Sequence, residues 1–357
     1  MSDSKSRAHA RLFLSRARTR LFFARGSRSS LWQRVASRAW RALTLVALAL
    51  AMTPARGADA VAPTAPAHPL NGKIWDVRAG KLVTMADLTD RLTGIDFVLL
   101  GEVHDNPEHH RNQAVVLTAL VANGRRPALA LEQFDREYQP AIDAVQATGA
   151  DAETLAEAGR FDRKGWTWQY YEPLLRIAIG ARLPIVAANL SRRAARDVAA
   201  QGLGSLAAPP DTMALSAVWT PAREAALVRA VVDAHCGQLP PDAATPLTLA
   251  QRARDATMAD SLLAHRARGA VLIAGAGHVR RDLAVPLYLR ARAPDARIVA
   301  IAMTEVIAGH DSPAGYETAT AGGGVEPVFD YLWFAPPADR DDPCAGMNMP
   351  QRTPRTN

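Results

Sequence analysis

Two short turns place histidine and glutamate at the ends of apolar segments, and they share the spacing G-x-x-H. The first is Gly101-Glu102-Val103-His104, after the apolar segment 95–100, and the second is Gly275-Ala276-Gly277-His278, after the segment 270–274. Imidazole and carboxylate groups can bind a metal ion or transfer a proton. A single histidine in such a place is more often a helix cap or a surface residue. The repetition favours a ligand or hydrolytic site.

More polar residues follow other apolar segments. Glu132 ends the segment 128–132, and Asn189 follows the segment 184–188. Asn106-Pro107 is typical of a helix start, which places His109, His110 and Gln113 on the first turns of that helix. In an open α/β sheet, ligands bind outside the carboxyl ends of the strands. We therefore expect these side chains to converge on one site.

Several common motifs are absent. The third glycine of a dinucleotide-binding G-x-G-x-x-G motif would fall at position 280, which is Arg280. The motifs G-x-x-x-x-G-K-[ST], G-x-S-x-G, H-E-x-x-H and C-x-x-C do not occur. The sequence therefore gives no support for nucleotide hydrolysis, a serine nucleophile elbow, a zincin site or thioredoxin chemistry.

The order of elements predicts the scaffold that carries these residues. Short, nearly continuous apolar segments predict buried parallel strands, and longer amphipathic segments between them predict helices. The expected strands are 95–100, 128–132, 184–188, 270–274 and 297–303. The expected helices are 107–122, 138–146, 168–181, 221–234, 247–267 and 282–291. This pattern predicts a three-layer α/β/α fold with a mostly parallel central sheet and a helical insertion at about 191–268.

The N-terminal segment has the order of a secretory signal. Many arginines precede the apolar run 42–52, and Ala58-Asp59-Ala60 is a cleavage site of the A-x-A type. The run is too short to span a bilayer, which needs about 20 apolar residues. We expect a signal peptide at 1–60, with a start nearer Val35, and a linker at 61–70. The product is then periplasmic or secreted, soluble and, without a lipobox, not lipid-anchored.

The charge of the chain is unevenly distributed. Of its 42 basic and 35 acidic residues, residues 1–60 hold 12 basic and 2 acidic. The remainder holds 30 basic and 33 acidic residues, a net charge of −3. Because nucleic-acid binding needs surplus positive charge on the folded part, we expect no nucleic-acid partner. The two cysteines, Cys236 and Cys344, form one disulfide or remain two thiols, and the sequence leaves both open.

An ordered set of short motifs is similar to one known family. The set comprises Leu99–Asn106, His109-His110 with Gln113, Leu131-Glu132, Trp168 with Tyr171–Pro173, Ala188–Leu190, His235-Cys236-Gly237, Gln251 with Arg254-Asp255 and Met258-Ala259, and Gly275–His278. In this order it closely resembles the ChaN-type haem-binding uptake family, across most of residues 90–335. That family shares a superfamily with Tiki proteases, TraB-like proteins and erythromycin esterases.

The resemblance implies a haem-binding protein of iron or haem uptake, with an α/β domain at 71–335 and a tail at 336–357. It implies haem as cofactor, held by a tyrosinate in a pocket that pairs two haems across a homodimer, and outer-membrane uptake machinery as a partner. Tyr171 is the expected iron ligand, with Tyr170 second. Other expected haem contacts are Trp168, His109, His110 and Asn189. Because an ordinary phenol is protonated at neutral pH, we expect an arginine or histidine close to the ligating oxygen.

A second function stays open from the residues alone. His104, His278 and Glu102 are the candidate ligands of a divalent metal ion, with Glu102 or Glu132 as the catalytic base of a hydrolase. The paired turns favour this alternative, because a haem carrier has no evident need for them. We expect a binding protein rather than an enzyme, because the resemblance is closest there.

Overall fold

The computed structural model describes residues 68–206, 219–318, 326–342 and 344–345. The predicted signal peptide at 1–60 and most of the predicted linker lie outside these residues. The last linker residue is part of the fold, since the side chain of Leu70 is buried. The first residues of the predicted tail are also engaged: the Pro336 carbonyl accepts a hydrogen bond from the Asn106 side chain at 2.9 Å.

The described residues form an eight-stranded sheet with the strand order β2-β1-β8-β7-β3-β6-β4-β5. The strands are β1 (Ile74–Asp76), β2 (Lys81–Val83), β3 (Phe97–Glu102), β4 (Ala128–Asp135), β5 (Ile185–Asn189), β6 (Ala270–Gly275), β7 (Ile298–Glu305) and β8 (Tyr331–Ala335). All pairs from β8 to β5 are parallel, whereas β1 is antiparallel to both of its neighbours. The predicted mostly parallel α/β fold is confirmed.

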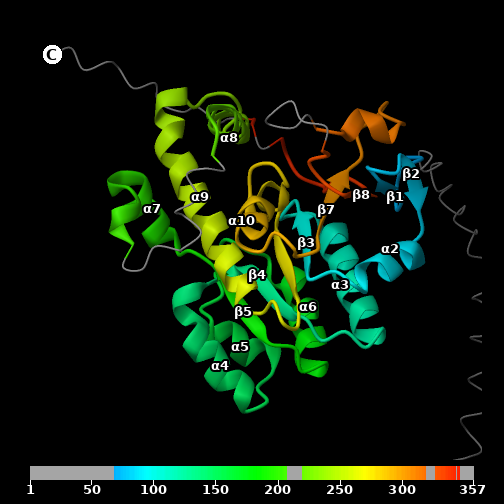
Figure 1. Cartoon of the computed structure of the whole chain (residues 1–357), viewed down its shortest axis with the longest axis vertical. Coiled ribbons are helices and arrows are strands. Elements are labelled where there is room, and N and C mark those ends of the chain that lie inside the picture. The colour runs from blue at the N-terminus through cyan, green and yellow to red at the C-terminus, as the bar shows by residue number, and fades with distance from the viewer. Residues whose placement is uncertain (1–67, 207–218, 319–325, 343, 346–357) are drawn as a thin grey trace, which may run out of the picture. The chain divides into compact units, whose positions relative to one another are not determined.

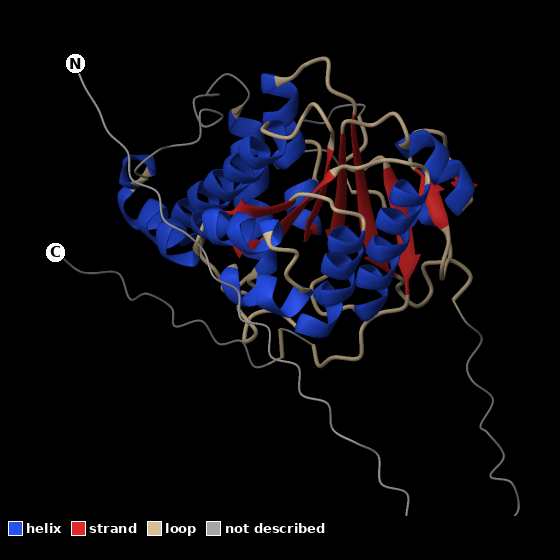
Figure 2. Cartoon of the chain, turned by 90° about the horizontal axis from the view of Figure 1, so that it is seen from below, coloured by secondary structure: helices blue, strands red, loops and turns tan. Residues whose placement is uncertain are grey.

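Helices pack on both faces of this sheet (Figures 1 and 2). They are α2 (Met85–Leu92), α3 (Pro107–Ala122), α4 (Gln139–Ala147), α5 (Ala152–Ala158), α6 (Trp168–Gly180), α7 (Arg192–Gln201), α8 (Pro221–Ala234), α9 (Pro241–Leu263) and α10 (Val285–Arg292). Helices α3 and α8 have the predicted bounds. Helix α9 begins at Pro241 rather than at 247, because a proline is well tolerated in the first turn of a helix.

The alternation of side chains along the strands separates the core into two layers. On one face, Val98 and Leu100 of β3 belong to a buried cluster with residues of α2 to α6. On the other face, Phe97 and Leu99 belong to a cluster with residues of α9 and α10. Both faces of a parallel sheet are thus covered, which explains the continuous apolar segments of the sequence.

The interval 191–268 contains α7, α8 and α9 and, in its described part, no strand. Helix α9 packs against α7, α8, α10 and the end of the sheet. A disulfide joins Cys236, just after α8, to Cys344 near the C-terminus. Of the two possibilities that the sequence left open, the structure has the disulfide.

Candidate functional site

The polar residues gather because the strands that carry them are neighbours. Strand β6 lies between β3 and β4, and β5 follows β4 at the edge. Glu102 of β3 pairs in register with Gly275 of β6, and the Glu132 carboxylate accepts a hydrogen bond from the Gly275 N–H at 2.8 Å. The two glutamates therefore flank the end of β6, where the second G-x-x-H turn begins.

The two G-x-x-H turns pack against each other through their glycines. A Cβ atom on Gly101 would lie 2.4 Å from Val279 Cγ2 and 2.8 Å from Ala276 Cα. A Cβ atom on Gly275 would lie 2.9 Å from the His104 ring. Each glycine thus leaves room for a residue of the other turn, which gives the spacing of the motif a steric reason.

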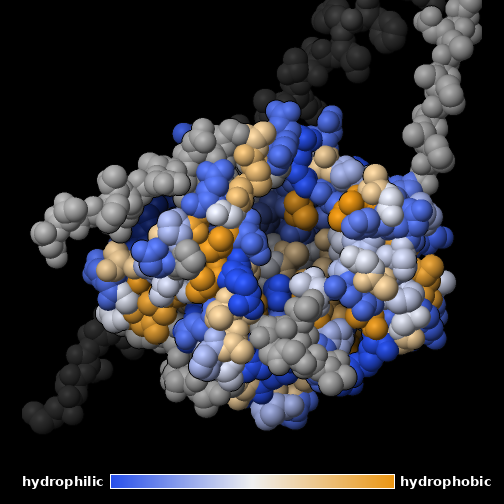
Figure 3. Space-filling model, turned by 90° about the horizontal axis from the view of Figure 1, so that it is seen from above, coloured by the Kyte–Doolittle hydropathy of each residue, from blue (hydrophilic) through white to orange (hydrophobic). Residues whose placement is uncertain are grey.

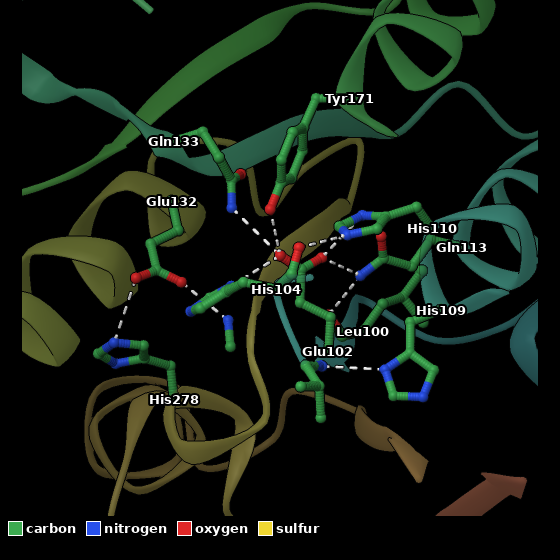
Figure 4. A network of polar contacts seen from close by, with 12 residues as sticks. Leu100, Glu102, His104, His109, His110, Gln113, Glu132, Gln133, Tyr171 and His278 are labelled. Atoms are coloured by element: carbon green, nitrogen blue, oxygen red, sulfur yellow. Dashed lines mark hydrogen bonds and ion pairs between the residues drawn. The ribbon is translucent and has the colours of Figure 1, made fainter. Parts of the chain in front are cut away.

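The Glu102 cluster is the set of side chains that surround the buried carboxylate of Glu102 (Figure 4). The Tyr171 hydroxyl donates to Glu102 Oε1 at 2.6 Å, and Gln113 Nε2 donates to Oε2 at 2.7 Å. His104 Nδ1 lies 2.9 Å from Oε1, and His110 Nδ1 lies 3.3 Å from Oε2. The carboxylate is therefore satisfied by side chains from α3, from α6 and from the turn after β3.

Two histidines of α3 are held inside the molecule. His110 Nε2 lies 3.0 Å from the His104 carbonyl, which can only accept, so this nitrogen carries a proton. His109 Nδ1 accepts the Val103 N–H at 2.9 Å, so its proton lies on Nε2, which is buried without a hydrogen-bond partner in the described part of the chain. Burial lowers the pKa of His109 to about 4, which leaves its ring neutral at pH 7.

The Glu102 cluster carries a fixed negative charge. Burial alone would raise the pKa of Glu102, but the neighbouring His110 and the bond from His104 outweigh it, and the pKa is lowered. For His104 burial acts downward, but the bond to Glu102 and the charge of Glu132 give a net rise in pKa. Burial and the adjacent Glu102 raise the pKa of Tyr171 well above its ordinary value.

The Glu132 cluster comprises Glu132, His278 and Asp255, and its imidazole lies between two carboxylates. His278 Nδ1 lies 2.6 Å from Asp255 Oδ1, and its Nε2 lies 3.5 Å from Glu132 Oε1. Burial would lower the pKa of His278, but these carboxylates raise it to about 10. Burial likewise opposes ionisation of Glu132, but His278 lowers its pKa to about 2. The cluster is thus a buried ion network at neutral pH.

A polar cavity of about 580 Å³ opens beside these clusters. His104, Glu132 and His278 line it, together with Trp166, whose ring centre lies 4.7 Å from that of His104. Tyr138 also lines the cavity, and the Arg160 guanidinium lies 5.6 Å from the centre of the Tyr138 ring.

An apolar cavity of about 510 Å³ adjoins the polar one and shares Arg192, Gln251, Arg254 and His278 with it. Its walls come from α7, α8 and α9 and from the segment after β6. Apolar lining residues are Ala195, Ala199, Leu227, Val231, Leu247 and Leu283. Figure 3 shows a hollow on the upper face of the molecule, where hydrophobic surface lies beside strongly hydrophilic residues.

The structure distributes the predicted haem contacts over different environments. Tyr171 is buried and lines neither cavity, and its hydroxyl donates to Glu102. The ring centre of His110 lies 4.7 Å from that of Tyr171, so a histidine is close, as expected. Tyr170 is half-buried and stacks on His110 at 4.9 Å. Trp168 is in the core against Phe161.

Asn189 is the predicted haem contact that lines the polar cavity. Its side chain donates to the Glu132 carbonyl at 2.9 Å and accepts from Arg254 at 2.9 Å. Asp255, Tyr138 and Arg254 were not predicted as site residues. The Arg254-Asp255 motif was the signal for two of these residues, whereas nothing around Tyr138 singled it out.

The candidate metal ligands gather, but not as a coordination group. Within the described residues, no three or more His, Cys, Asp or Glu side chains are placed to hold a metal ion.

No helix in the described part of the chain combines the length and the apolar character needed for a bilayer crossing.

Comparisons with known proteins identify the scaffold. The family model described as "Haem-binding uptake, Tiki superfamily, ChaN" matches residues 88–289. The solved structure of ChaN of Campylobacter jejuni with cofacial haem is similar at a TM-score of 0.58 and 22% identity, over 73% of this chain and 95% of that chain. A mutant of the erythromycin esterase EreC in its open conformation aligns with a TM-score of 0.42 and 17% identity, over 74% of this chain and 96% of that one. No curated protein matches the sequence significantly.

Proposed function

Because the chain belongs to the ChaN haem-binding uptake family of the Tiki superfamily, we propose that it is an exported haem-binding protein of haem or iron uptake. The observation that carries this proposal is the apolar cavity at the carboxyl ends of the strands. Its volume of about 510 Å³ lies within the range of about 300–1,000 Å³ for small-molecule and cofactor sites.

The lining of the apolar cavity fits the chemistry of haem. Haem has a flat apolar macrocycle and two carboxylates, so its site needs apolar walls and nearby cations. Alanine, leucine and valine side chains supply the walls, and Arg192, Arg196, Arg254 and Arg280 line the same cavity. Arg196 is exposed and has no ion pair or hydrogen bond within the described residues, so its charge is available to a propionate.

Ligation of the iron by Tyr171 stays a prediction, and it would require the Tyr171 hydroxyl to move away from its present partner. The hydroxyl would have to leave Glu102, and the buried carboxylate would then lose its shortest hydrogen bond. A tyrosinate beside Glu102 also places two negative charges side by side, which low-dielectric surroundings disfavour. Ligation by Tyr171 therefore requires a rearrangement of the Glu102 cluster.

Export is the second part of the proposal. The apolar run 42–52 with its A-x-A site supports it, and so does the Cys236–Cys344 disulfide, because disulfides persist in oxidising compartments. We expect the mature protein to begin near Val61 and to act in the periplasm or outside the cell. N-terminal sequencing of periplasmic material tests this, and an intact arginine-rich segment there would contradict it.

The experiment for haem binding is a haemin titration of the mature protein. A Soret band that saturates at a defined stoichiometry supports the proposal, and absence of saturable binding refutes it. Sedimentation with and without haemin tests the proposed homodimer. Pull-down from outer membranes tests the proposed contact with uptake machinery.

A metal-dependent hydrolase is the second candidate, because His104, Glu132 and His278 line the polar cavity together. In this role the carboxylates would take a proton from water while the histidines bind the metal ion. Elemental analysis of the purified protein, with ester and peptide hydrolysis assayed with and without added Zn²⁺, separates this candidate from haem binding.

A further inference from the structure

The motif His235-Cys236-Gly237 follows α8 and has no role in the two clusters described above. His235 lines the apolar cavity. Its Nδ1 lies 2.7 Å from the Val231 carbonyl, one helical turn earlier. Because a carbonyl only accepts, Nδ1 carries the proton and Nε2 keeps its lone pair. That lone pair has no partner among the described residues.

The rest of the motif fixes this histidine in place. Cys236 and Gly237 both have positive φ, 57° and 69°, a conformation that ends the helix sharply. The Gly237 N–H donates to the Val232 carbonyl at 3.0 Å. The disulfide from Cys236 to Cys344 then ties the turn to the C-terminal segment. The His235 imidazole is therefore attached to a helix end that the disulfide and this hydrogen bond hold in place.

The other histidines near the site have different partners or line a different cavity. His278 has a carboxylate at each ring nitrogen, and His110 lies between Glu102 and the His104 carbonyl. His104 has its Nδ1 on Glu102 and lines the polar cavity rather than the apolar one. The one unpartnered nitrogen of His109 carries its proton, because Nδ1 is the acceptor. Near the site, His235 thus combines a ring nitrogen, Nε2, that has no partner among the described residues with a place in the apolar cavity.

We propose that His235 Nε2 is an axial ligand of ferric haem in the apolar cavity. This inference rests on the proposed function and names the ligand within that same site. A metal-binding imidazole usually donates its other N–H to a carbonyl or a carboxylate, which fixes the ring and its tautomer, and the bond from Nδ1 to Val231 has this form. Arg192 and Arg196, one turn apart on α7, line the same cavity and can pair with the propionates.

The test compares the parent protein with His235→Ala, using haemin as the ligand and protein labelled with ¹⁵N-histidine. We expect the Kd for haemin to rise about tenfold or more in the variant, since even changes next to a metal ligand cost about 10–100-fold. Pulsed EPR of the ferric complex should show a histidine nitrogen coupled to the iron in the parent and none in the variant. Added imidazole should restore the parent spectrum of the variant.

Three further variants test whether the change in haemin binding is specific to His235 and to the apolar cavity. His310→Ala removes an exposed histidine outside the cavity and should leave the Kd and the spectrum unchanged. Ala230→Phe fills the cavity from α8 and should weaken haemin binding, whereas Ala225→Phe, exposed on the same helix, should not. Far-UV circular dichroism and thermal unfolding verify that each variant is folded.

The outcomes separate this inference from the proposed function. If the parent binds haemin and His235→Ala keeps both the Kd and the nitrogen coupling, the ligand assignment is overturned while haem binding stands. If Tyr138→Phe, Tyr170→Phe or Tyr171→Phe changes the ferric spectrum and His235→Ala does not, the ligand is that tyrosine. If the parent shows no saturable haemin binding, the proposed function fails and the assignment fails with it.

Discussion

The two G-x-x-H turns have the same spacing and occupy the same kind of position, yet they build different environments. The first turn supplies Glu102, whose carboxylate accepts bonds from several side chains in the interior. The second supplies His278, whose imidazole is held between Asp255 and Glu132. In one turn the anion is enclosed by donors, and in the other the cation is enclosed by anions. Equal motifs therefore do not imply equal chemistry.

The largest expected effect on the free energy of unfolding comes from replacing the two glutamates, Glu102 and Glu132, by alanine. Glu102→Ala leaves the donors of Tyr171 and Gln113 buried without their acceptor, so we expect a loss of about 3–5 kcal/mol in unfolding free energy. Glu132→Ala removes one acceptor, and His278 keeps Asp255, so we expect a loss of about 1–3 kcal/mol. Urea denaturation of both variants measures the difference, and equal losses would contradict the distinction between the clusters.

Tyr171→Phe tests the contribution of a single donor to the Glu102 cluster. A hydrogen bond to a charged group is worth about 1.5–3 kcal/mol, and the ring volume is preserved, so we expect a destabilisation in that range. Tyr170→Phe is the matched control, since that half-buried ring stacks on His110, and it should change stability by less than about 0.5 kcal/mol. The prediction is wrong if the two variants unfold at the same urea concentration.

Substitution by alanine should destabilise the protein to different extents at the two turn glycines, Gly101 and Gly275. Gly101→Ala pushes a Cβ atom against the backbone of Ala276, which cannot move easily, so we expect a loss of about 1–3 kcal/mol. Gly275→Ala meets the ring of His104, a half-exposed side chain that can turn away, so the loss should be smaller. Thermal unfolding compares the two variants, and a larger loss for Gly275→Ala would reverse this interpretation.

The smallest expected effect is on the pH dependence of the free energy of unfolding. His278 has a pKa of about 10 in the folded protein and an ordinary value near 6.5 when unfolded. Its contribution to stability is therefore complete below about pH 6.5 and lost as the pH rises towards 10. Between pH 7 and pH 8 we expect a loss of about 1 kcal/mol in the parent. His278→Gln should lack this slope, and an unchanged slope would show that other groups cause it.

Much of the fold follows from local patterns. The five strands from β3 to β7 begin within two residues of their predicted starts, because buried parallel strands are continuous apolar segments. Strands β1 and β2 were not predicted, since three residues carry no periodicity and their pairing depends on β8. Strand β8 is apolar, but no helix follows it, so the β-α alternation gave no reason to assign it.

The site was predictable as a place and less so as a set of contacts. The rule that ligands bind at the carboxyl ends of strands located Glu102, Glu132, His104 and His278 correctly at neighbouring strand ends. Tyr171 and Glu102 are 69 positions apart, and their bond depends on how α6 lies over β3. Helical periodicity directed Tyr171 inward with Leu174 and Leu175. The inward face of α6 packs in the core, and Tyr171 therefore lines neither cavity.

The disulfide has a consequence for how the protein responds to proteolysis. Cys236 and Cys344 are 108 positions apart, and the chain between them contains α9, β6, α10, β7 and β8. A protease that cuts once inside this covalent ring, for example in the exposed stretch 307–312, leaves two pieces that remain joined. The piece after the cut contains β8, and the disulfide keeps this strand attached to the rest of the molecule. It separates on a gel only after a reducing agent is added.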